Sequence, residues 1–213
     1  MFEDEWLSKR EIVESRLRNL FGIYGRTIYA RKCEVREVST ASASAFLREN
    51  HLQGPVNSPV RLGLYSGEEL AALMTFGKCR FDKKHEWELV RFCSKLNTRV
   101  VGGAGKLLRR FEKNYMPKSL VTYADRRWSV GGLYRKLGFS FVKNSPPNYW
   151  YADNAVRRYS RVKFQKHKLK RLLEKFDPDK SEVENMRDNG YFRVFDCGNM
   201  VFEKTYGAES AER

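Results

Sequence analysis

Three glycines and four basic residues lie close together in the segment RVVGGAGKLLRRF, residues 99–111. A strand-like segment precedes the glycines, and an apolar-periodic, basic helix follows them. The first turn of a helix carries unpaired N–H groups and a partial positive charge, and glycine lets a ligand approach that backbone. Arg99 and Lys106 add formal positive charge. The segment therefore predicts a phosphate-cradling loop; a glycine turn required by packing or by a positive φ is the alternative.

The glycine loop lacks the G-K-[ST] ending of a Walker loop and the G-x-G-x-x-G spacing of a dinucleotide site. Together with GLYRKLGF at residues 132–139, the pattern Arg99-x-x-Gly102-x-Ala104 resembles the GNAT acyltransferase superfamily over roughly residues 33–151. The resemblance implies an α+β fold, with a mixed, mostly antiparallel sheet flanked by helices. It also implies acetyl-CoA or a related acyl-CoA in a cleft where two central strands splay. The residues implied to bind this cofactor are Arg99, Gly102, Gly103, Ala104, Gly105 and Lys106.

Tyr134 lies in the second of these motifs. In the superfamily the matching tyrosine often protonates the departing CoA thiolate, and a phenol close to a thiolate can act as a general acid. A tyrosine that only packs its helix on the sheet is the alternative. Val130 departs from the pattern, because a small polar residue usually stands ahead of the two glycines. This departure leaves open an intact fold that has lost its cofactor.

Several short blocks also resemble the phage Mom-type DNA modification proteins, which are themselves GNAT-like. The blocks are NH at 50–51, RLGLY at 61–65, ELVRF at 88–92, TYAD at 122–125 and LY at 133–134. Mom-type enzymes place a modified acetamide group on the exocyclic amine of adenine in DNA. The resemblance implies a reactive cleft lined by His51, Glu88, Tyr123, Asp125 and Tyr134.

A weakly nucleophilic aryl amine needs a base, and His51, Glu88 or Asp125 could serve as one. Asp125 follows a buried-type strand, where cleft residues commonly lie. Structural roles stay open for all three. They are an N-cap or a salt bridge to Arg126 or Arg127 for Asp125, a pair with Arg91 for Glu88, and a plain loop position for His51.

The charge balance indicates a polyanionic partner. The chain has 213 residues, 41 Lys and Arg, 26 Asp and Glu, and a formal net charge of +15. Neutralisation of phosphates by such residues supplies most sequence-independent affinity for nucleic acid, so DNA is the first partner to consider. A target base in a duplex must be flipped out and stacked on aromatic rings. The candidates, for which core packing is the alternative, are Trp128, Tyr149, Trp150 and Tyr151.

The last third of the chain predicts a basic amphipathic helix over residues 157–175. Its expected inward side chains are Val162, Leu169, Leu172, Leu173 and Phe176. The near-absence of acids before Glu174 favours a face for the phosphate backbone over an ordinary solvated face. The expected nucleic-acid-binding residues are Arg126, Arg127, Arg157, Arg158, Arg161, Lys163, Lys166, Lys168, Lys170 and Arg171.

Residues 2–6 and 12–17 resemble the closing segment of Vsr-like nuclease domains in phage homing endonucleases. Some of those proteins carry a downstream region that resembles the rest of this chain. The metal-binding carboxylate core of such a nuclease is absent from this sequence, so we expect no nuclease activity. The four cysteines form no C-x-x-C pair, which predicts buried free thiols rather than a metal site.

We expect three parts: an N-terminal helix within residues 1–25, a GNAT-like domain over 26–155, and a basic helical and hairpin extension over 156–213. A capping box of Ser8 and Glu11 would begin the first helix, and residues 191–195 and 200–202 would form a closing hairpin. No segment is apolar enough to span a bilayer, and the acidic start MFEDEW is unlike a secretory signal. We therefore expect a cytoplasmic protein, in the host cell if it is phage-encoded.

The leading interpretation is a transferase that modifies a base amine in nucleic acid with a CoA-type donor. One rival is a non-enzymatic DNA-binding module related to a homing endonuclease. Another is an N-acetyltransferase for protein or small-molecule amines. The donor, the target base and the oligomeric state are left open by the sequence.

Overall fold

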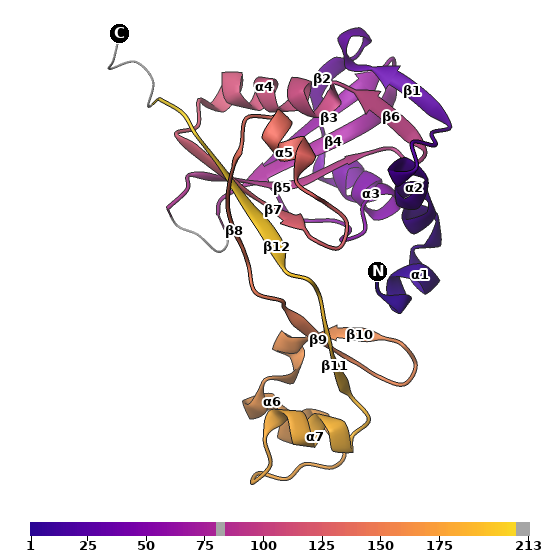
Figure 1. Cartoon of the computed structure of the whole chain (residues 1–213), viewed down its shortest axis with the longest axis vertical. Helices are drawn as coiled ribbons and strands as arrows, with labels where there is room; N and C mark the ends of the chain where they lie inside the picture. Colours follow the sequence, from indigo (N-terminus) through magenta and orange to yellow (C-terminus); the bar gives the residue numbers. More distant parts are fainter. Residues whose placement is uncertain (80–83, 208–213) are drawn as a thin grey trace.

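The computed structural model describes residues 1–79 and 84–207. Within these residues, the main sheet consists of seven strands, in the spatial order β2 (Glu34–Glu37), β3 (Val60–Ser66), β4 (Glu69–Gly77), β5 (Trp87–Ser94), β7 (Ser119–Asp125), β12 (Asn199–Thr205) and β8 (Ser140–Asn144). Neighbours run antiparallel except β5 and β7, which are parallel. Helices flank this sheet (Figure 1). The expected α+β class with a mixed, mostly antiparallel sheet is confirmed.

Strand β4 shows how the main sheet buries both of its faces. Ala72 and Met74 belong to the core that also contains the apolar face of α4 (Gly103–Tyr115). Leu73, between them, belongs to the core under α3 (Thr40–Asn50). Side chains of a strand alternate between faces, so the continuous apolar run of β4 packs against α4 on one face of the sheet and against α3 on the other.

The N-terminal segment forms two helices, α1 (Glu3–Ser8) and α2 (Arg10–Leu20). The expected capping box is wrong, because Ser8 ends α1 and its hydroxyl donates to the Asp4 carbonyl at 2.5 Å. Ile12 and Val13 of α2 pack on Leu52, just after α3. The first helices therefore cover one end of the main domain instead of projecting from it.

A second, two-stranded sheet joins β1 (Arg26–Tyr29) in parallel to β6 (Thr98–Val101). A short 3₁₀ turn, η1 (Ala30–Lys32), follows β1, and β6 leads directly into the glycine turn before α4. The expected order of strand, glycine turn and helix is confirmed.

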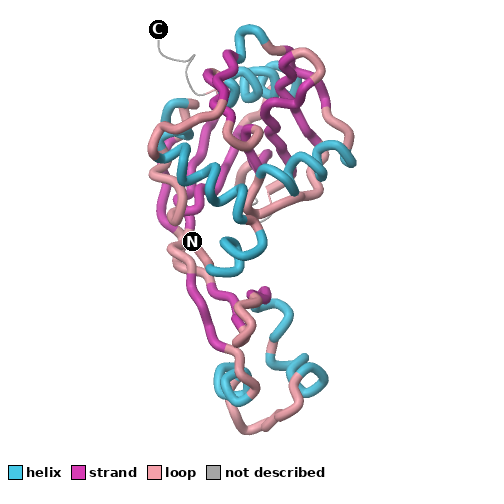
Figure 2. The backbone as a smooth tube through the Cα atoms, turned by 90° about the vertical axis from the view of Figure 1, so that its right-hand side faces the viewer, coloured by secondary structure: helices cyan, strands magenta, loops and turns pink. Residues whose placement is uncertain are grey.

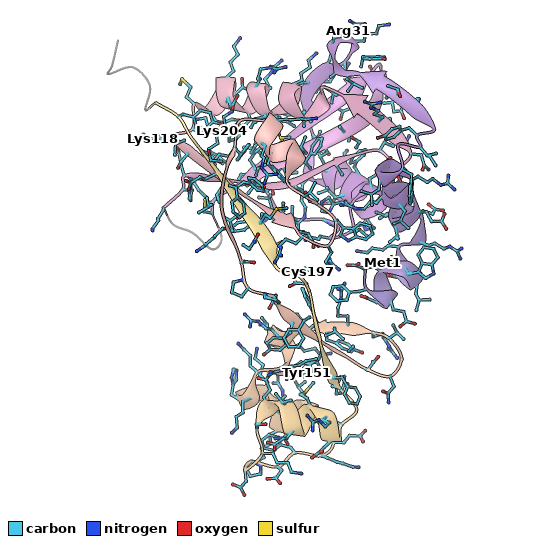
Figure 3. The ribbon with its side chains drawn as sticks, in the orientation of Figure 1. Met1, Arg31, Lys118, Tyr151, Cys197 and Lys204 are labelled. Carbon is cyan, nitrogen blue, oxygen red and sulfur yellow. The ribbon has the colours of Figure 1, made fainter. Side chains whose placement is uncertain are left out.

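The chain leaves the main sheet after β8 and returns to it with β12, and residues 145–198 between them form a small lobe (Figures 1 and 2). Its elements are β9 (Tyr149–Ala152), β10 (Arg158–Ser160), η2 (Arg161–Phe164), α6 (Lys166–Leu172), α7 (Glu182–Asp188) and β11 (Phe192–Phe195). Figure 3 shows Tyr151 inside this lobe and Cys197 where the chain returns to the main domain. Tyr151 is fully buried, in one cluster with Phe164, Leu169 and Met186.

The single basic helix expected over residues 157–175 is wrong. Arg158–Ser160 instead pairs antiparallel with β9, which places Tyr159 opposite Tyr151. Gln165 is extended and separates η2 from α6. Of the side chains expected to point inward, Leu169 is buried, whereas Val162 is exposed. Pairing with a distant strand overrides the local helical pattern here.

The expected closing hairpin is also wrong, because β11 pairs with β9 in the small lobe whereas β12 pairs with β7 and β8 in the main sheet. The expected boundary at residue 155 therefore does not follow the lobe. Its first strand precedes that boundary, and residues 199–205 complete the main sheet.

Cys33 and Cys93 are buried free thiols, as expected, whereas the free thiol of Cys197 is exposed. Among the residues that the structure describes, no helix has both the length and the apolar composition needed to cross a membrane.

Candidate active site

The two parallel strands at the centre of the main sheet separate. Pairing of β5 with β7 runs from Trp87 and Leu120 to Leu89 and Thr122 and ends there. At the same point β5 carries a bulge, because Thr75 of β4 is opposite Arg91 whereas the next residue is opposite Leu89. A bulge bends its strand and increases the local twist. This bulge accounts for the divergence of β5 from β7.

A cavity of about 590 Å³ lies between the separated strand ends. Residues 89–96 of and after β5 line one wall, and Tyr123 and Asp125 of β7 line another. Helix α2, the end of α3 and the start of α5 (Gly132–Lys136) add to the lining. The cavity therefore lies where the sequence led us to expect two central strands to splay.

Tyr134 lines this cavity from α5. Gly131 begins the helix with a φ of +77°, and a Cβ there would lie 2.4 Å from the Phe202 ring, so glycine is required. The Tyr134 ring stacks on Phe202, with ring centroids 5.3 Å apart. Burial raises the pKa of Tyr134, although the Thr122 hydroxyl and the charges of Arg16 and Arg91 oppose the shift. The phenol is therefore protonated at neutral pH and can donate a proton.

Asp125 also lines the cavity and is held by Arg127. Arg127 Nε lies 3.1 Å from both carboxylate oxygens, and Nη2 donates to Oδ2 at 2.6 Å. The structural alternative for Asp125, a salt bridge to Arg127, is therefore present. Asp125 is nevertheless the one acidic side chain among the described residues that line the cavity.

His51 lines the cavity at the end of α3. Its Nδ1 accepts a hydrogen bond from the Gln53 backbone at 3.1 Å, so the neutral ring carries its proton on Nε2. Burial, together with the charges of Arg91 and Arg16, lowers the pKa of His51 to about 3. A ring with this pKa is a weak base, and its neutral form offers the Nε2–H as a hydrogen-bond donor.

The remaining expected catalytic residues divide in two. Tyr123 lines the cavity, but Glu88 does not. Glu88 is 1% exposed and lies on the paired part of β5, before the strands separate. The sequence pattern placed Glu88 and Tyr123 in one cleft, whereas the structure places only Tyr123 in the cavity lining.

The glycine loop is only partly at the cavity. Arg99 lines it, whereas the residues from Gly102 to Lys106 do not. Lys106 Nζ donates to the carbonyls of Ala30 and Cys33 at 2.9 and 2.5 Å. A Cβ on Gly103 would lie 2.7 Å from Val100 Cγ1.

Packing and a φ of +76° at Gly102 therefore require glycines in this loop whether or not it binds phosphate. Within the described chain, no side chain caps the N–H groups of the first turn of α4. This leaves the helix N-terminus compatible with an anion.

Two cavity arginines, Arg16 and Arg91, were not among the expected site residues. Arg91 Nη1 donates to the adjacent Val90 carbonyl at 2.9 Å. The sequence contains a signal for Arg16, because it follows Ile12 by four residues and Val13 by three and so shares their apolar helix face. A charge on a buried stripe often marks a site rather than a solvated surface.

The expected nucleic-acid-binding residues differ in their surroundings. Arg127 and Arg158 are largely buried in ion pairs with acidic residues of the main domain and α1. Arg126 is exposed and donates to the Cys197 carbonyl at 2.8 Å. Lys168 is partly buried. The exposed members on the small lobe are Arg157, Arg161, Lys163, Lys166, Lys170 and Arg171.

Comparison with known proteins gives similarity of fold alone. No protein-family model matches the chain, and no curated protein matches it. One similar solved structure is described as histone acetyltransferase HPA2 and related acetyltransferase from Corynebacterium glutamicum. It is 12% identical, has a TM-score of 0.49, and the match covers 84% of this chain and 99% of the other.

Another similar structure is an acetyltransferase of Bacillus subtilis in complex with CoA. It is 14% identical, has a TM-score of 0.46, and the match covers 83% of this chain and all of the other. At these values the similarities do not decide what this chain binds or does.

Proposed function

We propose that the chain is a GNAT-type acyltransferase that binds an acyl-CoA in the cavity and transfers the acyl group to an amine of a nucleic-acid base. The observation that carries the proposal is the coincidence of three features at one place. They are the bulge after Leu89, the end of β5–β7 pairing, and Tyr134 in the cavity that opens there.

The cavity fits the thioester arm of such a donor. Beyond Leu89 and Thr122 the facing edges of β5 and β7 no longer pair with each other, so their backbone groups can bind the amides of an extended arm. The uncapped first turn of α4 and Arg99 would hold the phosphates. The donor supplies an activated acyl thioester.

The residues of this chain then transfer protons at two atoms, the leaving sulfur and the attacking nitrogen. Tyr134 keeps its proton at neutral pH because burial raises its pKa, so its hydroxyl can donate to the sulfur that leaves. Asp125, which Arg127 holds in the cavity wall, accepts the proton of the attacking amine. His51 donates through Nε2 and orients the acceptor.

The charge distribution supports nucleic acid as the acceptor. Between Asp153 and Glu174 the sequence has eight Lys and Arg residues and no acid, and this segment covers one part of the small lobe. Most of these side chains are exposed. A cationic surface of this kind suits the phosphate backbone.

The test is mass spectrometry of nucleosides from DNA of cells that express the chain, beside the Tyr134→Phe and Asp125→Asn variants. We expect a new adenine derivative that the variants do not make. Unmodified DNA, from protein that binds duplex tightly but no acyl-CoA, would favour the non-enzymatic DNA-binding module. Consumption of acetyl-CoA with a free amine and no DNA would favour an ordinary N-acetyltransferase.

A further inference from the structure

Arg16 brings a positive charge to the cavity from a helix outside the main sheet. It lies on α2, on the face that carries Ile12 and Val13, both of which are buried. Its guanidinium lies over the Trp128 ring, 5.0 Å from the centroid. The side chain is one of the residues that line the cavity.

Among the described residues, none forms an ion pair with the Arg16 guanidinium, although the charge of Asp125 acts on it. Arg16 Nε is enclosed without a hydrogen bond. The nearby carboxylate of Asp125 is engaged through two oxygens with Arg127. Buried charges in proteins are normally paired, because desolvation is costly. An anion in the cavity would supply the missing partner.

Most of the other charged residues that line the cavity are also positive. Arg91 and Arg99 line the cavity as well, and Asp125 is the one acid among the described lining residues. The charges of Arg16 and Arg91 both contribute to the lowered pKa of His51. Most charged side chains that line the cavity are therefore cationic, and a neutral ligand would leave the Arg16 charge without an ion pair to any described residue.

Arg16 lines the same cavity as Tyr134 and Cys93. Its charge opposes the rise that burial causes in the pKa of each of these two groups. The residues from Gly102 to Lys106, where the donor phosphates would be held, do not line the cavity, whereas Arg16 does. An anion at Arg16 therefore belongs to the acyl group or to the acceptor.

We propose that Arg16, with Arg91, forms an oxyanion subsite that binds a carboxylate or phosphate group beside the reacting atoms. The planar guanidinium fork matches both groups. This subsite rests on the proposed function and would make the enzyme specific for a substrate that carries an anionic group. The oxyanion is either a terminal carboxylate of the acyl group or a phosphate of the acceptor nucleotide.

The test measures equilibrium binding to the full chain by calorimetry, with two matched pairs of probes. Succinyl-CoA is compared with acetyl-CoA, and adenosine 5′-monophosphate with adenosine. We expect one anionic probe to bind about tenfold more tightly than its neutral match, since charge-assisted hydrogen bonds are the stronger ones. Arg16→Met should abolish that preference and leave the neutral probe unchanged. Arg18→Met, an exposed arginine on the same helix, is the control.

Preference for succinyl-CoA would assign the oxyanion to the acyl group, and preference for the monophosphate would assign it to the acceptor. If Arg16→Met unfolds, Arg16→Lys replaces it in the test. This variant keeps the charge but removes the guanidinium fork, so it should retain part of the preference. Equal binding within both pairs to the wild-type chain would overturn the subsite, even if acyl-CoA binds. Binding of the monophosphate alone, with no acyl-CoA bound, would instead overturn the proposed function and keep the subsite.

Discussion

Arg158 of the small lobe donates from Nη2 to Oε1 of Glu5 in the first helix at 3.2 Å. The same carboxylate accepts from Arg127 Nη1 at 3.1 Å, and Arg127 in turn holds Asp125 in the cavity. Arg127 and Arg158 also lie over the Phe2 ring, at 4.4 and 3.9 Å from its centroid. The N-terminal helix therefore joins the small lobe to the wall of the candidate active site.

Glu5→Ala should destabilise the protein by about 2 kcal/mol, because it removes charge-assisted hydrogen bonds to two largely buried arginines, whose ion-pair partners among the described residues are then only Asp125 and Asp4. The Glu5 side chain is 7% exposed, so solvent screens these ion pairs little. Urea unfolding measures the reduction in the free energy of unfolding. Glu3→Ala, at an exposed position of the same helix, is the control and should change stability little. Equal stabilities of the two variants would show that the ion pairs do not hold the lobe.

The same carboxylate predicts a dependence on pH. Burial acts to raise the pKa of Glu5, but the Phe2 backbone N–H and the charges of Arg127 and Arg158 outweigh it and lower the pKa below 4.5. A lowered folded-state pKa contributes stability that is present above the ordinary value and is lost as the pH falls through the folded value. Wild-type stability should therefore decline below about pH 4.5 more steeply than that of Glu5→Gln, in thermal unfolding across pH. Parallel curves for the two proteins would contradict the assignment.

Tyr134→Phe should reduce acyl transfer by about 10²- to 10⁴-fold, as for removal of a general acid. Acyl-CoA affinity should stay the same, because the ring that stacks on Phe202 is kept. Single-turnover kinetics separates transfer from binding. Tyr115→Phe, on α4 and outside the cavity lining, is the matched control. Unchanged transfer in Tyr134→Phe would leave this tyrosine with a packing role only.

Asp125→Asn should abolish product while DNA affinity is retained, because the change removes the proton acceptor and none of the exposed cations of the small lobe lines the cavity. It also removes the charge that pairs with Arg127, so the unfolding temperature must be measured beside the activity. Filter binding gives the DNA affinity. Turnover like that of the wild type in a folded Asp125→Asn protein would contradict the proposed role.

Local patterns predicted the parts of the site that depend on short segments. The glycine turn before α4, the strand ending at Asp125 and the helix that carries Tyr134 lie where their sequences indicate. Each is specified by residues within about ten positions, through positive φ, apolar runs or helix periodicity.

The features that the sequence did not reveal depend on distant partners. The bulge after Leu89 is defined by how β5 pairs with β4. The end of pairing at Thr122 is defined by how β5 and β7 lie side by side. Arg158 lies in a segment with helical periodicity, yet it is in a strand because β9 is available to pair with it. Long-range pairing of this kind leaves little trace in local composition.

The exposed cations of the small lobe predict how DNA binding depends on salt. Lys166, Lys170 and Arg171 are exposed on or beside α6, and no described acid forms an ion pair with them. Removal of one cation that binds a phosphate should reduce the slope of log affinity against log salt by about 0.9. Lys166→Gln, Lys170→Gln and Arg171→Gln together should therefore weaken binding and flatten this slope.

Lys180→Gln is the matched control, because Lys180 is already paired with Asp188 at 2.8 Å and with Asp177. Fluorescence anisotropy with a duplex at several salt concentrations gives the slopes. A triple variant with the wild-type slope would exclude α6 from the nucleic-acid interface. The basic part of the small lobe would then account for net charge but not for binding, and the acceptor would have to be sought among other amines.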